Sequence, residues 1–175
     1  MNKIEFALED FKNIQELIKF IDQKSGFLLV IQSILVSIFV NIFDNSVLIN
    51  PFLISENLDF FKSIILFLLS LSFIIILIIQ IYKIIFEILL PKKAINYKND
   101  EKSLFYYEHI TRFERDEFCK TYNTLDEEKI LSTILFQIYE VSKIMKAKET
   151  SYTIATKLLF MSTIILFVIL IINKI

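Results

Sequence analysis

One segment of the chain, Phe105–Arg115, combines aromatic side chains with two arginines. Aromatic faces can stack on a heterocyclic base, and a guanidinium can hold a phosphate through two parallel hydrogen bonds. The segment therefore indicates a site for an anionic ligand that carries a base. The candidate ligand-binding residues are Arg112, Arg115, Tyr106, Tyr107 and Phe113, with Lys92 and Lys93 as secondary candidates.

Core packing is a second interpretation of the same segment. Aromatic residues at helical spacing are more often buried in a core than exposed to a ligand. Glu108 and Glu114 also lie close to the arginines in sequence and can form ion pairs with them. The pattern favours core packing on frequency and leaves both interpretations open.

Catalytic and metal-binding residues are scarce. The chain has one histidine, His109, and one cysteine, Cys119, which lie ten residues apart. This spacing disfavours a zinc site and a Cys–His nucleophile pair, and it favours structural roles for a half-buried histidine and a small apolar cysteine. No nucleotide-fold fingerprint, phosphate-binding loop or hydrolase elbow is present. We therefore expect neither an enzyme, a metal nor a resident cofactor.

Three long uncharged apolar runs must position these residues: Phe27–Phe43, Ser63–Tyr82 and Leu158–Asn173. A bilayer core about 30 Å thick needs about 20 apolar residues in a helix. The third run is short, but it can extend through Thr153–Thr156 while Lys157 and Lys174 snorkel. The runs predict three transmembrane helices, with the charged segment between the second and third.

The distribution of lysine and arginine predicts the orientation. The N-terminal segment and the segment between runs two and three hold most of these residues, whereas the connection Asp44–Lys62 holds only Lys62 and the tail only Lys174. Because positive charge marks the cytoplasmic side, the N-terminus and residues 91–152 should be cytoplasmic and the C-terminus outside. A formal net charge of −1 argues against nucleic acid as a partner.

The pattern before and after the spans is helical. In residues 3–24, apolar side chains recur at helical spacing with charged side chains opposite. This pattern predicts an amphipathic helix that leads into the first span. Run two should continue to Leu90 and stop at Pro91, with Lys83 and Glu87 paired four residues apart. Asp22 and Lys24 lie where the chain reaches the membrane, where they either mark the interface or pair with the cytoplasmic helices.

The charged segment should contain two helices. Residues 101–118 show an apolar helical face, and Thr121–Leu125 looks like a break. Thr124 is the expected cap of the next helix, with Glu127 completing a capping box. That helix should run without interruption into the third span.

The predicted fold class is an all-α integral membrane protein. Its parts are an N-terminal amphipathic helix (1–24), a two-span hairpin (25–90), a cytoplasmic helical sensor segment (91–152) and a third transmembrane helix (153–175). The spans contain few polar residues, which either join helix to helix or line a path. These residues are Gln32, Ser33, Ser37, Asn41, Ser70, Ser72 and Gln80.

The order of three motifs resembles the Pycsar-type transmembrane effector family. The motifs are FIDQKSGFLLVIQ at the start of span one, SLFYYEHITRFERDEF in the charged segment, and ILFQIYEVSKIMKAKETSYTIATKLLF leading into span three. Together they cover most of residues 18–165. On this resemblance, Asp22, Lys24, Gln137, Ser142 and Lys143 are candidates for coupling the sensor to the membrane.

The resemblance implies a bacterial anti-phage effector. Such an effector senses cyclic UMP or cyclic CMP made by a pyrimidine nucleotide cyclase and impairs the inner membrane. One subunit with three spans is too small to enclose a wide aqueous path, so a pore would require a homo-oligomer.

Other functional classes remain open at the level of sequence. The alternative to the effector is a structural or accessory membrane subunit whose cytoplasmic helices dock a protein partner without any nucleotide. The chain can also be a small effector module of another nucleotide-signalling defence system. A membrane enzyme is the least favoured class, because no polar cluster converges at one depth.

Overall fold

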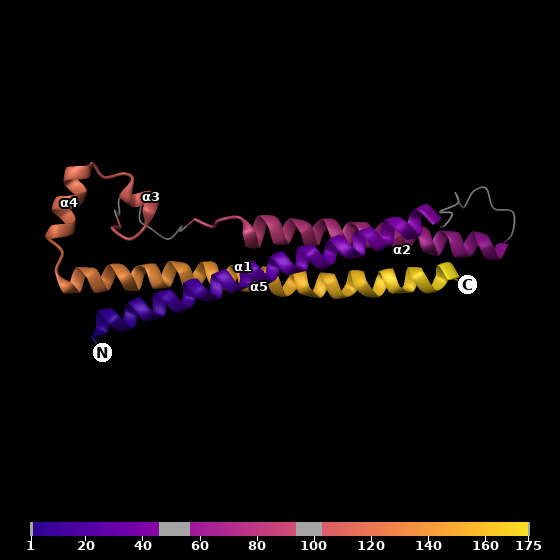
Figure 1. Cartoon of the computed structure of the whole chain (residues 1–175), viewed down its shortest axis with the longest axis horizontal. Coiled ribbons are helices and arrows are strands. Elements are labelled where there is room, and N and C mark those ends of the chain that lie inside the picture. Colours follow the sequence, from indigo (N-terminus) through magenta and orange to yellow (C-terminus); the bar gives the residue numbers. More distant parts are fainter. Residues whose placement is uncertain (1, 46–56, 94–102, 175) are drawn as a thin grey trace. The chain divides into compact units, whose positions relative to one another are not determined.

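A computed structural model describes residues 2–45, 57–93 and 103–174, and these contain helices and no strand (Figure 1). The elements in chain order are α1 (Lys3–Asn45), α2 (Asn57–Tyr82), the π-helix η2 (Lys83–Leu89), α3 (Tyr107–Ile110), α4 (Arg115–Asn123) and α5 (Glu127–Lys174). Three helical stretches are long and apolar enough to cross a membrane: Lys3–Ile42, Phe60–Leu89 and Glu127–Lys174. The predicted all-α fold with three spans is confirmed.

The chain divides into two compact units, which we describe separately. The helical unit comprises Met1–Ile21 and Pro91–Glu149, and the membrane unit comprises Asp22–Leu90 and Thr150–Ile175. Helices α1 and α5 each contribute residues to both units. The predicted uninterrupted run of the amphipathic segment into span one, and of the last helix into span three, is therefore confirmed.

The membrane unit is held by a buried stripe on each span. On α1 the buried residues Ser25, Leu28, Gln32, Leu35 and Phe39 alternate at steps of three and four, the spacing of left-handed helix packing. An apolar core joins residues of α1, α2 and α5, and the Phe39 and Phe73 rings lie 4.8 Å apart. Its buried members are Leu35, Phe39, Phe73, Leu77, Leu166 and Ile169.

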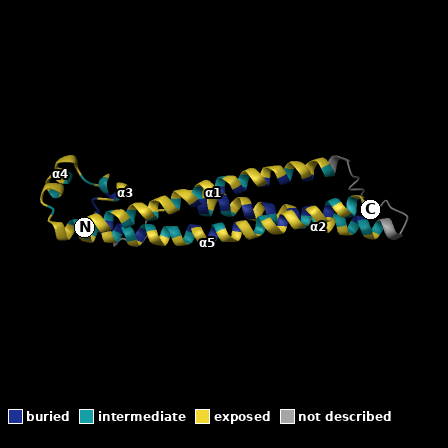
Figure 2. Cartoon of the chain, turned by 60° about the horizontal axis from the view of Figure 1, so that its bottom comes forward, coloured by how far each residue is buried: buried dark blue, intermediate teal, exposed yellow. Residues whose placement is uncertain are grey.

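The remaining faces of the spans are exposed and apolar. Phe27 is 70% exposed, and Phe67 and Phe167 are also largely uncovered. Exposed positions recur along each of α1, α2 and α5 (Figure 2). Helices that are apolar all round need either a protein core or lipid around them. Because the membrane unit covers only one stripe of each span, the outer faces fit a lipid bilayer.

The end of the second span has a geometry that the sequence did not predict. The predicted helix does continue past Tyr82 and stop before Pro91, but its last seven residues, Lys83–Leu89, form a π-helix. The N–H of Leu90 bonds to the carbonyl of Ile85 at 2.9 Å, five residues back. The predicted ion pair is confirmed, with Lys83 Nζ 2.9 Å from Glu87 Oε1.

Two predictions about the charged segment are wrong. Residues 103–118 do not form one helix, because Tyr106 and Glu114 have extended backbones that leave α3 as a single turn and start α4 at Arg115. The cap of α5 is Asp126, whose Oδ1 accepts the N–H of Lys129 at 2.8 Å. Thr124 instead lies at the C-terminal cap of α4, where its hydroxyl donates to the carbonyl of Thr121.

Parts of two predicted loops lie outside the described residues. These are residues 46–56 of the connection between spans one and two, and residues 94–102, which include most of the segment after Pro91.

Candidate functional site

A buried polar network fixes the start of the aromatic and basic segment in the helical unit. The N–H of Ser103 donates to His109 Nδ1 at 3.1 Å, and Gln137 Nε2 of α5 donates to Ser103 Oγ at 3.2 Å. His109 is 4% exposed, so it is buried rather than half-buried as predicted. Because Nδ1 accepts a hydrogen bond, the proton of the neutral ring lies on Nε2.

The network explains why no continuous helix forms here. The Oγ of Ser103 also accepts the N–H of Phe105 at 3.2 Å, which gives the backbone a local partner outside a helix. Side chains that bond to nearby backbone in this way compete with helix formation. The segment therefore folds onto α5 through polar contacts, and these contacts place the aromatic residues that follow.

Tyr106, Tyr107 and Lys93 come together around one carboxylate. Lys93 Nζ lies 2.8 Å from Glu108 Oε1, and the Tyr107 hydroxyl donates to the same oxygen at 3.4 Å. The Tyr106 ring meets the Tyr107 ring edge-on at 5.3 Å. The hydrogen bond from Lys93 lowers the pKa of Glu108 below its ordinary range, and the same bond raises the pKa of Lys93.

Arg112 and Arg115 are exposed and lie in an acidic setting. Neither guanidinium has an ion-pair partner among the described residues. Arg115 begins α4, whose first turn also carries Asp116 and Glu117. These carboxylates already complement the positive end of the helix dipole, so an incoming phosphate would rely on the arginines themselves.

The structure groups the predicted ligand residues only in part. Phe113 is half-buried and its ring meets Phe118 edge-on at 5.9 Å, which fits the packing interpretation for this residue. Lys92 is half-buried, and Lys93 is occupied by Glu108. In the described part of the chain, no hydrogen bond or ion pair joins either guanidinium to Tyr106, Tyr107 or Lys93.

The candidate coupling residues fall into different environments. Gln137 is buried against Ser103, whereas Ser142 donates to the carbonyl of Ile138 at 2.6 Å and Lys143 lies 5.4 Å from the centre of the Tyr139 ring. Ser142 and Lys143 thus contact their own helix. Asp22 is half-buried and Lys24 exposed within the membrane unit.

Sequence reasoning missed the polar character of the α5 face in the helical unit. Glu140 and Lys148 are 2% and 4% exposed and lie on the same stripe as Ile134 and Gln137. A charged residue at a helical core position is the signal that could have revealed this stripe. The apolar spacing of Ile130, Ile134, Ile138, Val141 and Met145 masked it.

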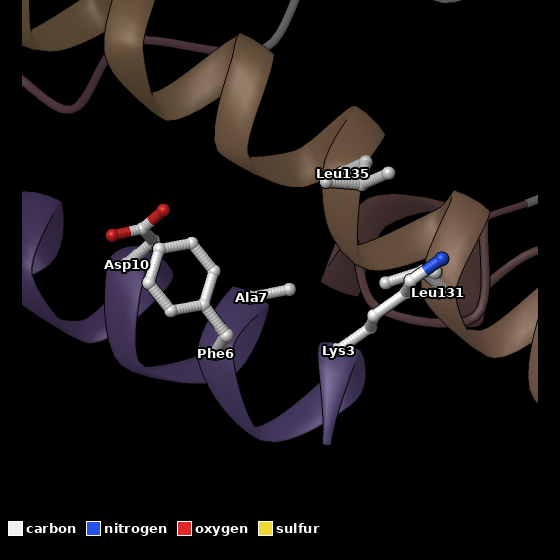
Figure 3. Close-up of a pocket in the computed structure, with 6 residues that line it drawn as sticks. All are labelled: Lys3, Phe6, Ala7, Asp10, Leu131 and Leu135. Atoms are coloured by element: carbon white, nitrogen blue, oxygen red, sulfur yellow. The ribbon is translucent and has the colours of Figure 1, made fainter. Parts of the chain in front are cut away.

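A groove in the helical unit is lined by none of the predicted ligand residues. It has a cavity volume of about 410 Å³ and is mostly apolar, with one lysine and one aspartate on its wall (Figure 3). The lining residues are Lys3, Phe6, Ala7, Asp10, Leu131 and Leu135. With equal positive and negative charge, this groove does not select an anion.

Some polar contacts in the described part of the membrane unit join helix to helix. Ser151 Oγ of α5 donates to Glu87 Oε2 at 2.6 Å, and Gln32 Nε2 of α1 donates to the carbonyl of Leu77 at 3.1 Å. Other span residues bond within their own helix instead. These are Ser33, Ser37 and Ser72.

Metal and nucleophile chemistry find no support in the part of the chain that the structure describes. No group of three or more His, Cys, Asp or Glu side chains there could hold a metal ion. His109 is buried and Cys119 is exposed, so the predicted small apolar cysteine is instead on the surface.

The sequence matches the family model for the Pycsar effector protein domain over residues 6–173. The chain belongs to this family. No curated protein and no solved structure matches it.

The Pycsar match covers both compact units. It includes the Ser103–His109–Gln137 network and the Lys83–Glu87–Ser151 contacts, together with all three spans. Membership in a family of anti-phage effectors, with three helices able to cross a bilayer, assigns the protein to antiviral defence at a membrane. The resemblance seen in the three motifs is confirmed at the level of the family.

Proposed function

We propose that the protein senses a cyclic pyrimidine mononucleotide, cyclic UMP or cyclic CMP, through its helical unit and, as a homo-oligomer, impairs the integrity of the bacterial inner membrane. The family match over residues 6–173 carries this proposal, because it places the helical unit and the spans in one effector domain. The activating nucleotide would come from a pyrimidine nucleotide cyclase, the functional partner.

The proposed orientation puts the sensor where the nucleotide is made. The excess of lysine and arginine before span one and between spans two and three favours a cytoplasmic helical unit, with the C-terminus outside. A nucleotide that prefers one arrangement of the helices would shift the population toward it by its differential affinity.

The proposed ligand contacts are the exposed basic and aromatic residues of the segment after Ser103. Arg112 and Arg115 are free to grip a phosphate, and Tyr107, 65% exposed, offers a face for a base. Lys93 would first have to leave Glu108, so it is a weaker candidate for the phosphate.

Thermal unfolding of the detergent-purified protein against a panel of cyclic mononucleotides and dinucleotides tests the proposal. Binding to the folded protein alone stabilises it by about 2.7 kcal/mol at a ligand concentration of 100 times Kd. We expect Tm to rise with cyclic UMP or cyclic CMP and with no cyclic dinucleotide. Arg112→Ala should remove the shift, and Lys120→Ala, an exposed charge on α4, should keep it.

Two results would count against the proposal. A cooperative melt with no shift for any nucleotide would contradict sensing and favour the accessory subunit that docks a protein partner. A full shift in Arg112→Ala would exclude Arg112 as a phosphate contact.

A further inference from the structure

Two glutamines are buried within the spans of the membrane unit. Gln32 of α1 is 2% exposed and Gln80 of α2 is 0% exposed. Gln32 uses its Nε2 on the carbonyl of Leu77, but its Oε1 and both amide atoms of Gln80 have no hydrogen-bond partner among the described residues. Three strong polar atoms are therefore buried without a protein partner.

Such atoms are costly in this position. A buried polar group without a hydrogen bond costs about 1–3 kcal/mol, and the hydrocarbon core of a bilayer offers no compensating solvent. Backbone groups of α1 and α2 are already used within the helices, as in every spanning helix. The neighbouring hydroxyls of Ser33 and Ser37 avoid the cost by donating to their own helix, at 2.9 Å each.

The helix register places the two glutamines in one layer of the helix pair. The contacts Gln32–Leu77 and Phe39–Phe73 show that α1 and α2 run antiparallel. Continuing this register places Gln80 opposite about residues 29–32 of α1, within roughly one turn of Gln32. Ser25, also buried and with an unpartnered Oγ, lies about two turns further toward the start of α1.

We propose that Gln32 and Gln80 bind ordered water inside the membrane unit of a single subunit. The site presents two acceptors, Gln32 Oε1 and Gln80 Oε1, and one donor, Gln80 Nε2. Water can donate to the first two and accept from the third, and a buried water usually makes two to four such bonds. A cation would leave the Nε2 donor unpaired, so the mixed set of atoms selects water.

The water site also has a consequence for the proposed impairment of the membrane. Water held between α1 and α2 is a polar break in an otherwise apolar helix interface, and polar groups at this depth commonly mark pathways. This consequence rests on the proposed function, whereas the water site itself does not.

Water-edited solid-state NMR of the full chain in lipid bilayers, with glutamine side-chain amides labelled, tests the site directly. We expect magnetisation to pass from water to the Gln80 amide in the unaltered protein and in the Ser33→Ala control. The exposed amide of Gln15 is the internal reference for water contact. If Gln15 receives magnetisation and Gln80 does not, the amides are paired within the protein and the site is wrong.

Dye release from liposomes, triggered by the nucleotide, tests the consequence. Gln80→Leu should slow release by about tenfold relative to the unaltered protein, and Ser33→Ala should leave it unchanged. Unchanged dye release in a folded Gln80→Leu variant would show that the layer of Gln32 and Gln80 has no role in membrane damage. If the unaltered protein releases no dye with any nucleotide, the proposed function fails, and the NMR result alone decides the water site.

Discussion

Gln137 of the helical unit and Gln80 of the membrane unit are both buried glutamines on long helices, 5% and 0% exposed. Gln137 donates to Ser103 Oγ, which lies on a segment outside any helix. Gln80 faces helices whose backbone groups are already bonded, and it finds no partner in the described residues. The irregular segment thus supplies a side-chain partner to Gln137, whereas the spanning helices supply a partner to Gln32 Nε2, the carbonyl of Leu77, and none to Gln80 among the described residues.

The largest expected difference between the two units is in the cost of removing a buried isoleucine from α5. Ile134 and Ile169 are 2% and 3% exposed, but the first lies in the helical unit and the second in the membrane unit. Ile134→Ala should cost about 2–5 kcal/mol in the opening free energy of nearby amides, measured by hydrogen exchange. Ile169→Ala should cost about 2 kcal/mol less, because lipid solvates the lost carbons as well as a core does.

Equal costs at the two sites would contradict the expected difference between the helical unit and the membrane unit. They would mean that Ile169 loses contact with water on folding just as Ile134 does. Ile154→Ala, at a 37% exposed position on the same helix, controls for the loss of helix propensity alone.

The next effect concerns the glutamines themselves. Gln137→Leu should destabilise the helical unit by about 1–3 kcal/mol, because Ser103 loses a buried donor. Gln80→Leu should leave stability unchanged or raise it, since an apolar side chain replaces an amide that no protein group satisfies. Thermal unfolding in detergent compares the two variants, with Gln15→Leu at an exposed position as the control. A loss of stability in both variants would show that the Gln80 amide makes hydrogen bonds in the folded protein that contribute as much as those of Gln137.

The smallest effect is electrostatic and belongs to the exposed surface of the helical unit. The hydrogen bond from Lys93 lowers the pKa of Glu108 from 4.5. The contribution of Glu108 to folding stability is therefore present above pH 4.5 and is lost as pH falls through its pKa in the folded protein. The same hydrogen bond raises the pKa of Lys93 from 10.5. The contribution of Lys93 to folding stability is therefore present below pH 10.5 and is lost as pH rises through its pKa in the folded protein.

Lys93→Met should therefore lower stability slightly between these limits and have no effect in strong acid. Thermal unfolding at a series of pH values measures the difference, and Lys120→Met is the control for charge alone. A difference between Lys93→Met and the unaltered protein that persists well below the pKa of Glu108 would show that the lysine contributes through packing instead.

Sequence alone predicts the parts of this structure that depend on local pattern. The three spans follow from run length, the Lys83–Glu87 pair follows from its spacing, and the stop at Leu89 follows from Pro91. Family membership could also be inferred, because the motifs occur in the family's order along the chain.

The sequence could not reveal features that depend on distant partners. His109 Nδ1 accepts the N–H of Ser103, and Ser103 Oγ accepts from Gln137, which lies 34 positions further along the chain. The choice between Thr124 and Asp126 as the cap depends on where α4 ends, and α4 takes Thr121–Asn123 from the predicted break. Whether the Gln80 amide finds a partner depends on which atoms of α1 face it, and no periodicity encodes that.

The π-helix at the end of the second span has a consequence for how the chain tolerates changes in length. Bonds that reach back five residues enclose more chain per turn than ordinary helical bonds do. The segment Lys83–Leu89 thus holds about one residue that an α-helix over the same path would not need. A one-codon deletion there can be absorbed by tightening the turn, whereas the same deletion between Phe73 and Gln80 would rotate half of the buried stripe toward lipid.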